Sequence, residues 1–151
     1  WMEKTLLIYD KATLNYEKSL SYEGEGWGLT TDGKSLIRSD GSATIYFHDP
    51  KDFHVIKTIQ VKDGKKDISQ LNELEYVEGF LWANVWHDDK IVKIDLTNGQ
   101  VIAQLNLAGL KSKVKLENSE QVLNGIAWDP KQNAFWVTGK QWPKMFLIKI
   151  R

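Results

Sequence analysis

Short apolar stretches, separated by turns rich in glycine, aspartate and asparagine, run along most of this chain. The densest stretch covers residues 71–86, where two strands are predicted to meet at a tight turn formed by Glu78 and Gly79. Its apolar content is typical of strands that are covered on both faces. Further strands are predicted at residues 5–9, 15–22, 29–31, 35–38, 44–47, 54–61, 91–94, 101–105, 123–128, 134–137 and 145–150, with a polar loop and a short helix at 109–121. Together these elements predict an all-β fold.

Two polar groups stand at the ends of this dense hairpin, Asn72 near its start and Trp86 at its end. A buried amide has to find hydrogen-bond partners, and an indole leaves one donor to satisfy. A plain core would not choose these groups, so their placement favours a role in binding. Taken alone, Trp86 would more often be a core residue, and Asn72 could be a turn cap.

The turns of this chain recur at a spacing that indicates repeated units. Asp10, Asp49 and Asp95 each follow a predicted strand and begin a turn, at intervals of 39 and 46 residues. Spacings of about 40–45 residues are typical of four-stranded propeller blades. The sequence therefore predicts a β-propeller, of which this chain supplies roughly three blades and part of another.

Each repeat has an opening position at the start of its first strand and a closing position after its second strand. The opening positions are Trp27, Asn72 and Asn124, and the closing positions are Gly41, Trp86 and Lys140. In a propeller the innermost strands line a central channel, so equivalent positions form rings around one end of it. The repeats therefore predict a binding cavity walled by aromatic, amide and ammonium groups. Without this register, Lys140 would more often be a solvated turn lysine.

Trp1 fits the closing position of a further blade, because it precedes the outer strands of that blade as Trp86 precedes Ile91. The inner hairpin of that blade would then lie ahead of Trp1. A propeller closes with at least about four blades. We therefore expect residues 1–151 to form a single propeller domain that lacks its N-terminal blade or blades. Exposed strand edges would favour association with that missing segment or with another copy.

Charge and composition narrow the choice of partners and cofactors. The 20 basic and 20 acidic side chains give zero net charge, which provides no electrostatic reason to expect nucleic acid or an anionic membrane as partner. No apolar stretch reaches membrane-spanning length, and no signal peptide opens the chain. Cysteine is absent, and His48, His54 and His87 make no ligand-spaced pair, so neither a metal site nor a cofactor is predicted.

Several long motifs of this chain resemble those of one family. They are Gly26–Gly33, Ser39–Ser42, Leu71–Tyr76, Ala83–Trp86, Val122–Asp129 and Val137–Pro143. These motifs closely resemble the glutamine cyclotransferases, the plant and bacterial type of glutaminyl-peptide cyclase, in order and over essentially the whole chain. The resemblance implies a five-bladed β-propeller and a metal-independent reaction that converts N-terminal glutamine to pyroglutamate and releases ammonia. It also implies a peptide or protein with N-terminal glutamine as partner, and a secreted or periplasmic location.

The resemblance further implies roles for individual residues. It places Trp1, Trp27 and Trp86 in an aromatic box that holds the glutaminyl chain and excludes water. Asn124, at the matching ring position, is added to this substrate-binding set. Asn72 and Lys140 are the implied catalytic residues of this chain. Asn72 would orient the amide or the oxyanion, and Lys140 would stabilise negative charge on the carbonyl oxygen or keep a glutamate ionised.

The general acid/base of the family is a glutamate in a Phe-Gly-Glu-Gly motif one blade earlier, which would lie ahead of Trp1. The nearest similar stretch of this chain is Gly24-Glu25-Gly26, in the following blade. Trp27, not Glu25, occupies the opening position there, so the resemblance does not assign the catalytic role to Glu25.

Two other hypotheses stay open on the sequence alone. A propeller fold by itself implies no chemistry, so a non-catalytic propeller that binds peptides through its aromatic channel is the alternative function. A truncated or proteolysed product that completes its ring with another segment is the other. For the remaining residues, Trp82, Trp128 and Trp136 are interpreted as inter-blade packing, Trp142 as packing or cavity rim, and Glu73 and Glu75 as solvated or structural.

Overall fold

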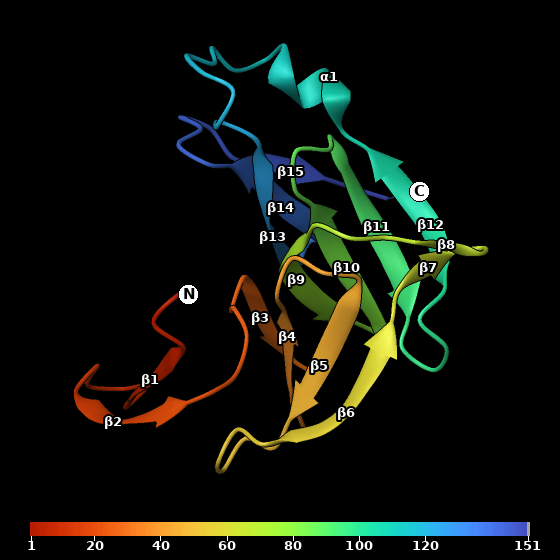
Figure 1. Ribbon diagram of the computed structural model, residues 1–151. Coiled ribbons are helices and arrows are strands. Elements are labelled where there is room, and N and C mark those ends of the chain that lie inside the picture. The colour runs from red at the N-terminus through yellow and green to blue at the C-terminus, as the bar shows by residue number, and fades with distance from the viewer. Residues whose placement is uncertain (151) are drawn as a thin grey trace.

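Antiparallel β-sheets make up nearly all of the regular structure in the computed structural model, which describes residues 1–150 (Figure 1). The strands are β1 (Thr5–Tyr9), β2 (Tyr16–Ser21), β3 (Gly28–Thr31), β4 (Leu36–Ser39), β5 (Thr44–His48), β6 (Val55–Gln60), β7 (Lys62–Asp63), β8 (Lys66–Asp67), β9 (Leu71–Val77), β10 (Phe80–Val85), β11 (Lys90–Asp95), β12 (Val101–Asn106), β13 (Leu123–Asp129), β14 (Ala134–Gly139) and β15 (Phe146–Ile148). One short helix, α1 (Ala108–Lys111), lies within residues 1–150, and no helix in this part is long and apolar enough to cross a membrane. The all-β prediction is confirmed.

The sheets follow the chain as simple meanders. Strands β3 to β6 form one four-stranded sheet and β9 to β12 another, while β13 to β15 form a three-stranded sheet and β1–β2 and β7–β8 are pairs. The first strand of the second sheet, β9, contacts the first strands of its neighbours, β3 and β13. Within residues 1–150 these sheets do not close into a ring. Figure 1 shows the β1–β2 hairpin at the N-terminal end of this series of sheets, beside the β3–β6 sheet.

The predicted turn at Glu78 and Gly79 is confirmed. Val77 of β9 pairs with Phe80 of β10, which leaves a two-residue loop. Both loop residues have positive φ, 50° for Glu78 and 90° for Gly79. This is the geometry of a type I′ turn, whose twist matches that of the flanking strands.

Strand β10 is buried on both faces, as its apolar content predicts. Leu81, Ala83 and Val85 pack into a core shared with the β3–β6 sheet. The intervening Trp82 packs into a second core shared with β13–β15, with its ring 4.9 Å from that of Phe135. Because alternate strand residues point to opposite faces, one strand supplies both cores.

The remaining tryptophans divide between packing and other contacts. Trp128 packs against Phe135 of its own hairpin at 4.7 Å and against the core that the β9–β12 and β13–β15 sheets share, which confirms its assignment to inter-blade packing. Trp142 is buried in the same core and donates from Nε1 to the Gln121 carbonyl at 2.9 Å, so packing is its role. Trp136 stays a predicted inter-blade packing residue. It lies on the strand face opposite the core residues Phe135 and Val137, and its indole donates to Asp129 at 3.3 Å within its own hairpin.

The small hairpin β7–β8 lies where no strand is predicted. Its residues Lys62, Asp63, Lys66 and Asp67 are charged and carry no apolar period. Lys62 additionally bridges to Gln100 beside β12. Backbone pairing, rather than burial of an apolar face, defines these two strands.

The core between the β9–β12 and β3–β6 sheets can be tested with a substitution in β10. Leu81 is fully buried, so Leu81→Ala is expected to lower the free energy of unfolding by about 2–5 kcal/mol. Leu29→Ala is the control, because Leu29 is 44% exposed; a change below about 1 kcal/mol is expected there. Urea unfolding measures both, and equal losses would contradict the burial of Leu81 in the core shared with the β3–β6 sheet.

Candidate active site

A cavity of about 270 Å³ opens where the first strands of the sheets converge. Its lining residues are Trp1, Gly26, Trp27, Asn72, Trp86, Asn124 and Lys140. The structure therefore brings together all six residues proposed from the sequence for catalysis or substrate binding. Gly41, the remaining closing position, lies directly behind Trp27, because a Cβ built on it would be 2.6 Å from the indole ring.

Asn72 is held by a relay of hydrogen bonds from the neighbouring sheet. The Gly28 amide donates to Ser39 Oγ at 2.9 Å, and the Ser39 hydroxyl donates to the Asn72 carbonyl at 2.7 Å. A Cβ on Gly28 would lie 2.1 Å from that carbonyl oxygen, so only glycine permits the approach. The relay satisfies the buried backbone of Asn72 and leaves its side chain in the cavity wall.

The closing residues Trp86 and Lys140 are held by equivalent backbone hydrogen bonds. The Trp86 amide donates to the Gln70 carbonyl at 2.8 Å, and the Lys140 amide donates to the Val122 carbonyl at 2.9 Å. Each acceptor lies two residues ahead of the opening position, Asn72 or Asn124, of its own repeat. This equivalence explains why the internal repeat locates the cavity wall.

The aromatic part of the wall is a chain of ring contacts. Trp27 and Trp86 meet edge to face, with ring centroids 5.2 Å apart and planes at 88°. Lys140 Nζ lies 5.4 Å from the centroid of the Trp86 ring, within cation–π range. Among residues 1–150 the buried Trp86 Nε1 has no acceptor, so the wall retains one donor for a bound group or water.

Asn124 joins two first strands. Its Oδ1 accepts a long hydrogen bond of 3.4 Å from the Glu73 amide. Asn84, which sequence reasoning did not single out, is fully buried and accepts from the Gly125 amide at 2.9 Å. Both amides therefore position the start of the 123–139 hairpin, and the Asn124 side chain also lines the cavity.

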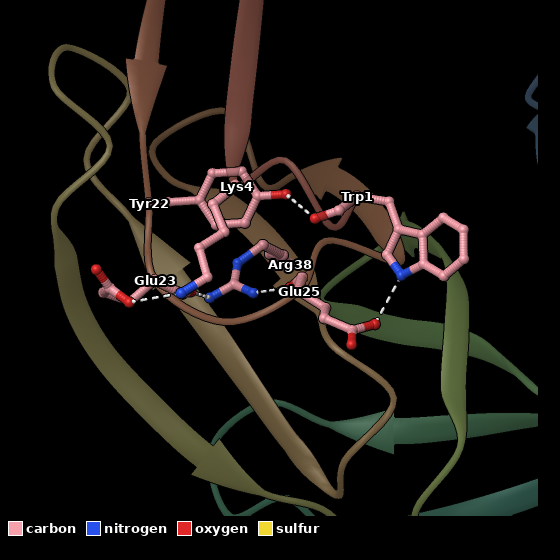
Figure 2. A network of polar contacts seen from close by, with 6 residues as sticks. All are labelled: Trp1, Lys4, Tyr22, Glu23, Glu25 and Arg38. Atoms are coloured by element: carbon pink, nitrogen blue, oxygen red, sulfur yellow. Dashed lines mark hydrogen bonds and ion pairs between the residues drawn. The ribbon is translucent and has the colours of Figure 1, made fainter.

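Glu25 was passed over as a catalytic residue, and the structure shows a different contact for it. Its Oε2 accepts hydrogen bonds from the indole nitrogens of both Trp1 and Trp27, each at 2.7 Å. Figure 2 shows the Trp1 indole directed at this carboxylate. The bonds from Trp27 and Trp1 hold the pKa of the Glu25 carboxyl below its usual range. The spacing of Glu25 and Trp27 could have suggested contact, but the approach of Trp1 is visible only in three dimensions.

The two glutamates of β9 differ in their surroundings. Glu75 Oε1 accepts from the Trp128 amide at 2.9 Å and so joins β9 to β13, which confirms a structural role. Glu73 is partly buried rather than solvated, and burial raises the pKa of its carboxyl. Neither side chain lines the cavity. Within residues 1–150 no three His, Cys, Asp or Glu side chains are grouped to hold a metal ion.

The fold and the cavity together define a class: an all-β protein of repeated sheets, with an aromatic and amide-lined cavity where the first strands converge. The sequence profile of the glutamine cyclotransferase family matches residues 1–150. The chain belongs to the glutamine cyclotransferase family.

Relatives and solved structures agree with this assignment. The glutaminyl-peptide cyclotransferase of Arabidopsis thaliana is 39% identical over 155 residues, covering 100% of this chain and 48% of the relative. This chain thus spans about half the length of that curated relative. The crystal structure of Myxococcus xanthus glutaminyl cyclase matches with a TM-score of 0.93 at 36% identity, over 97% of this chain and 64% of the other. The computationally designed Ika4 protein shares the fold alone, with a TM-score of 0.56 at 11% identity over 99% of this chain and 81% of the other.

The close packing of Gly41 on the Trp27 ring can be tested by substitution, with Gly33 as the control. Gly41 and Gly33 both have φ of 83°, but a Cβ on Gly33 would meet nothing within 4 Å. Alanine at either position is expected to cost about 1–2 kcal/mol of stability through backbone strain. Only Gly41→Ala should also displace the Trp27 ring, which near-ultraviolet circular dichroism detects. Identical spectra for the two variants would contradict the close packing of Gly41 on Trp27.

Burial of Glu73 gives stability a defined pH dependence. Since its pKa in the folded state is raised above 4.5, its ionised form opposes folding at pH values above the raised pKa. Glu73→Gln is therefore expected to stabilise the protein at pH 7, by an amount that vanishes as pH falls below 4.5. Unfolding in urea across this pH range measures the effect, with Glu78→Gln in the exposed turn as control. A constant difference between the Glu73 variant and wild type at all pH values would contradict this account.

Proposed function

We propose that this protein is a glutaminyl-peptide cyclotransferase, which converts an N-terminal glutaminyl residue to pyroglutamyl and releases ammonia. The observation that carries the proposal is the cavity, in which three tryptophans, two asparagines and a lysine from separate repeats meet. The similarity to the Arabidopsis glutaminyl-peptide cyclotransferase and the Myxococcus glutaminyl cyclase supports the same reaction. Its substrates would be peptides or proteins with N-terminal glutamine.

The reaction requires the α-amine to attack the γ-carboxamide carbon of the same residue. The amine nitrogen loses a proton, the carbonyl oxygen carries negative charge in the tetrahedral intermediate, and the amide nitrogen leaves as ammonia after gaining a proton. The flexible side chain has to be folded so that the two reacting groups lie about 3–3.5 Å apart. A pocket with rigid aromatic walls favours this folded shape and excludes the water that would otherwise compete.

The lining residues divide these tasks. Trp1, Trp27 and Trp86 would enclose the aliphatic part of the glutaminyl chain. The Asn72 side chain would donate to the carbonyl oxygen as its negative charge develops, where a fixed donor is most effective. The Lys140 ammonium would supply positive charge on the same side, as its position over the Trp86 ring permits.

The proton transfer requires a further group. Among residues 1–150 no carboxylate lines the cavity. We assign the general acid/base to the glutamate of the Phe-Gly-Glu-Gly motif that the resemblance places ahead of Trp1. The complete fold would be a five-bladed propeller, supported by the repeated register of the closing positions and by the close structural likeness to the Myxococcus enzyme.

The alternative is a non-catalytic propeller that binds N-terminal peptides in the same cavity. The observation that favours it is the lack of a carboxylate among the lining residues of 1–150. The two functions differ in one measurable product, ammonia. Tight binding of a glutaminyl dipeptide without ammonia release from the full-length protein would support the binding protein.

Ammonia release from a glutaminyl dipeptide by the full-length protein tests the proposal. An asparaginyl dipeptide is the substrate control, because its cyclisation would require a strained four-membered ring. Asn72→Ala is expected to lower kcat by about 10²–10³-fold, the usual loss for one oxyanion donor. Asn98→Ala, in an exposed turn, is the matched control and should retain activity. Unchanged kcat in the Asn72 variant would contradict its assigned role.

A further inference from the structure

The carboxylate of Glu25 accepts hydrogen bonds from two residues that line the cavity, Trp1 and Trp27. One oxygen, Oε2, receives the indole N–H groups of Trp1 and Trp27, both at 2.7 Å. Glu25 itself does not line the cavity. Hydrogen bonds to a charged acceptor are about twice as strong as those between neutral groups, so this carboxylate can fix the orientation of both rings.

The segment that carries Glu25 is held by a buried cation. Arg38 is only 3% exposed, and its guanidinium donates to the carbonyl oxygens of Glu25 and Glu23. Its Nε lies 3.1 Å from His48 Nε2, and its guanidinium stacks over the Tyr46 ring at 4.4 Å. Figure 2 shows the guanidinium lying against the 23–25 segment. A buried charge is costly unless it is well paired, so these contacts fix the backbone of that segment.

The hydrogen bond to the Glu25 carbonyl differs from the equivalent bond in the other two repeats. In the other two repeats the carbonyl two residues ahead of the opening position, on Gln70 or Val122, accepts from the backbone amide of the closing residue. Glu25 holds the equivalent place two residues ahead of Trp27, but its carbonyl accepts from the Arg38 side chain. In the first repeat, therefore, the Arg38 guanidinium takes the place of the backbone amide as donor to this carbonyl. The residue that carries the carbonyl, Glu25, also binds two indoles through its side chain.

We propose that Glu25 is a positioning residue that holds Trp1 and Trp27 in the orientation the substrate requires. This role rests on the proposed function, because it concerns binding of the glutaminyl substrate. Trp27 packs edge to face against Trp86, and the Lys140 ammonium lies over the Trp86 ring. A shift of the Trp27 ring would therefore also affect the positions of Trp86 and Lys140. Loss of Glu25 therefore loosens the whole aromatic wall.

The surroundings of Glu25 do not suit proton transfer. A general base works best when its pKa lies near the operating pH, whereas the indole bonds lower the pKa of Glu25. Its oxygen Oε2 already accepts two hydrogen bonds, and Glu25 is not among the residues that line the cavity. These features fit an ionised anchor.

The test uses the full-length protein and two independent readouts. The first is the position of the indole N–H resonances of Trp1 and Trp27 in ¹H–¹⁵N spectra, assigned with Trp1→Phe and Trp27→Phe. The second is the split between KM and kcat for a glutaminyl dipeptide. The variants are Glu25→Ala, which removes the acceptor, and Glu25→Gln, which keeps an acceptor oxygen without the charge. Glu23→Ala is the matched control, since that exposed carboxylate contacts Lys4, at 3.2 Å, and neither indole among residues 1–150.

In Glu25→Ala both indole resonances should move upfield, and KM should rise about tenfold with a smaller change in kcat, as expected for lost bonds to a charged acceptor. Glu25→Gln should recover most of the wild-type KM, and Glu23→Ala should match wild type in both readouts. Unmoved indole resonances and an unchanged KM in Glu25→Ala would overturn the proposal. So would a collapse of kcat in both Glu25 variants with loss of the acidic limb of the pH profile, because that result would identify a proton carrier. If wild type releases no ammonia, the proposed function fails, while the indole resonances still decide whether Glu25 anchors both rings.

Discussion

Burial on both faces of the β9–β12 sheet is the constraint on which the rest of the structure depends. Strand β10 directs Leu81 into one core and Trp82 into another, so the sheet needs a neighbour on each side. The neighbours β3–β6 and β13–β15 satisfy this requirement, and β9 then contacts both of their first strands. The cavity lies where those strands converge. The position of the cavity therefore follows from the packing of the three sheets and does not depend on the side chains that line it.

Convergence of the first strands brings backbone polar groups together, and the same contacts that satisfy them place the site. Ser39 bonds the Asn72 carbonyl, and Arg38 bonds the Glu25 carbonyl. Gly28 makes the first of these approaches sterically feasible. Because a buried polar group without a partner is costly, the fold and the site rest on shared hydrogen bonds. Variants in this region are therefore best judged with a structural readout beside the activity.

The internal repeat was the most informative feature of the sequence. It predicted that Asn72, Trp86, Asn124 and Lys140 share one cavity, because equivalent positions of stacked repeats fall at equivalent places in space. It did less well where contacts are not repeated. The charged β7–β8 pair, for example, has no apolar period to reveal it.

By itself, the sequence determined the strand-rich fold class, the tight turn at Glu78 and Gly79, the repeat and the family motifs. These features are local or periodic, and they follow from the two-residue alternation of strands and from turn chemistry. Only the tertiary structure decided that Glu25 accepts the indoles of Trp1 and Trp27, and that Arg38 is buried against the Glu25 carbonyl. Such contacts depend on side-chain directions and on the approach of segments distant in the chain, as between Trp1 and Glu25, and no periodic pattern encodes these.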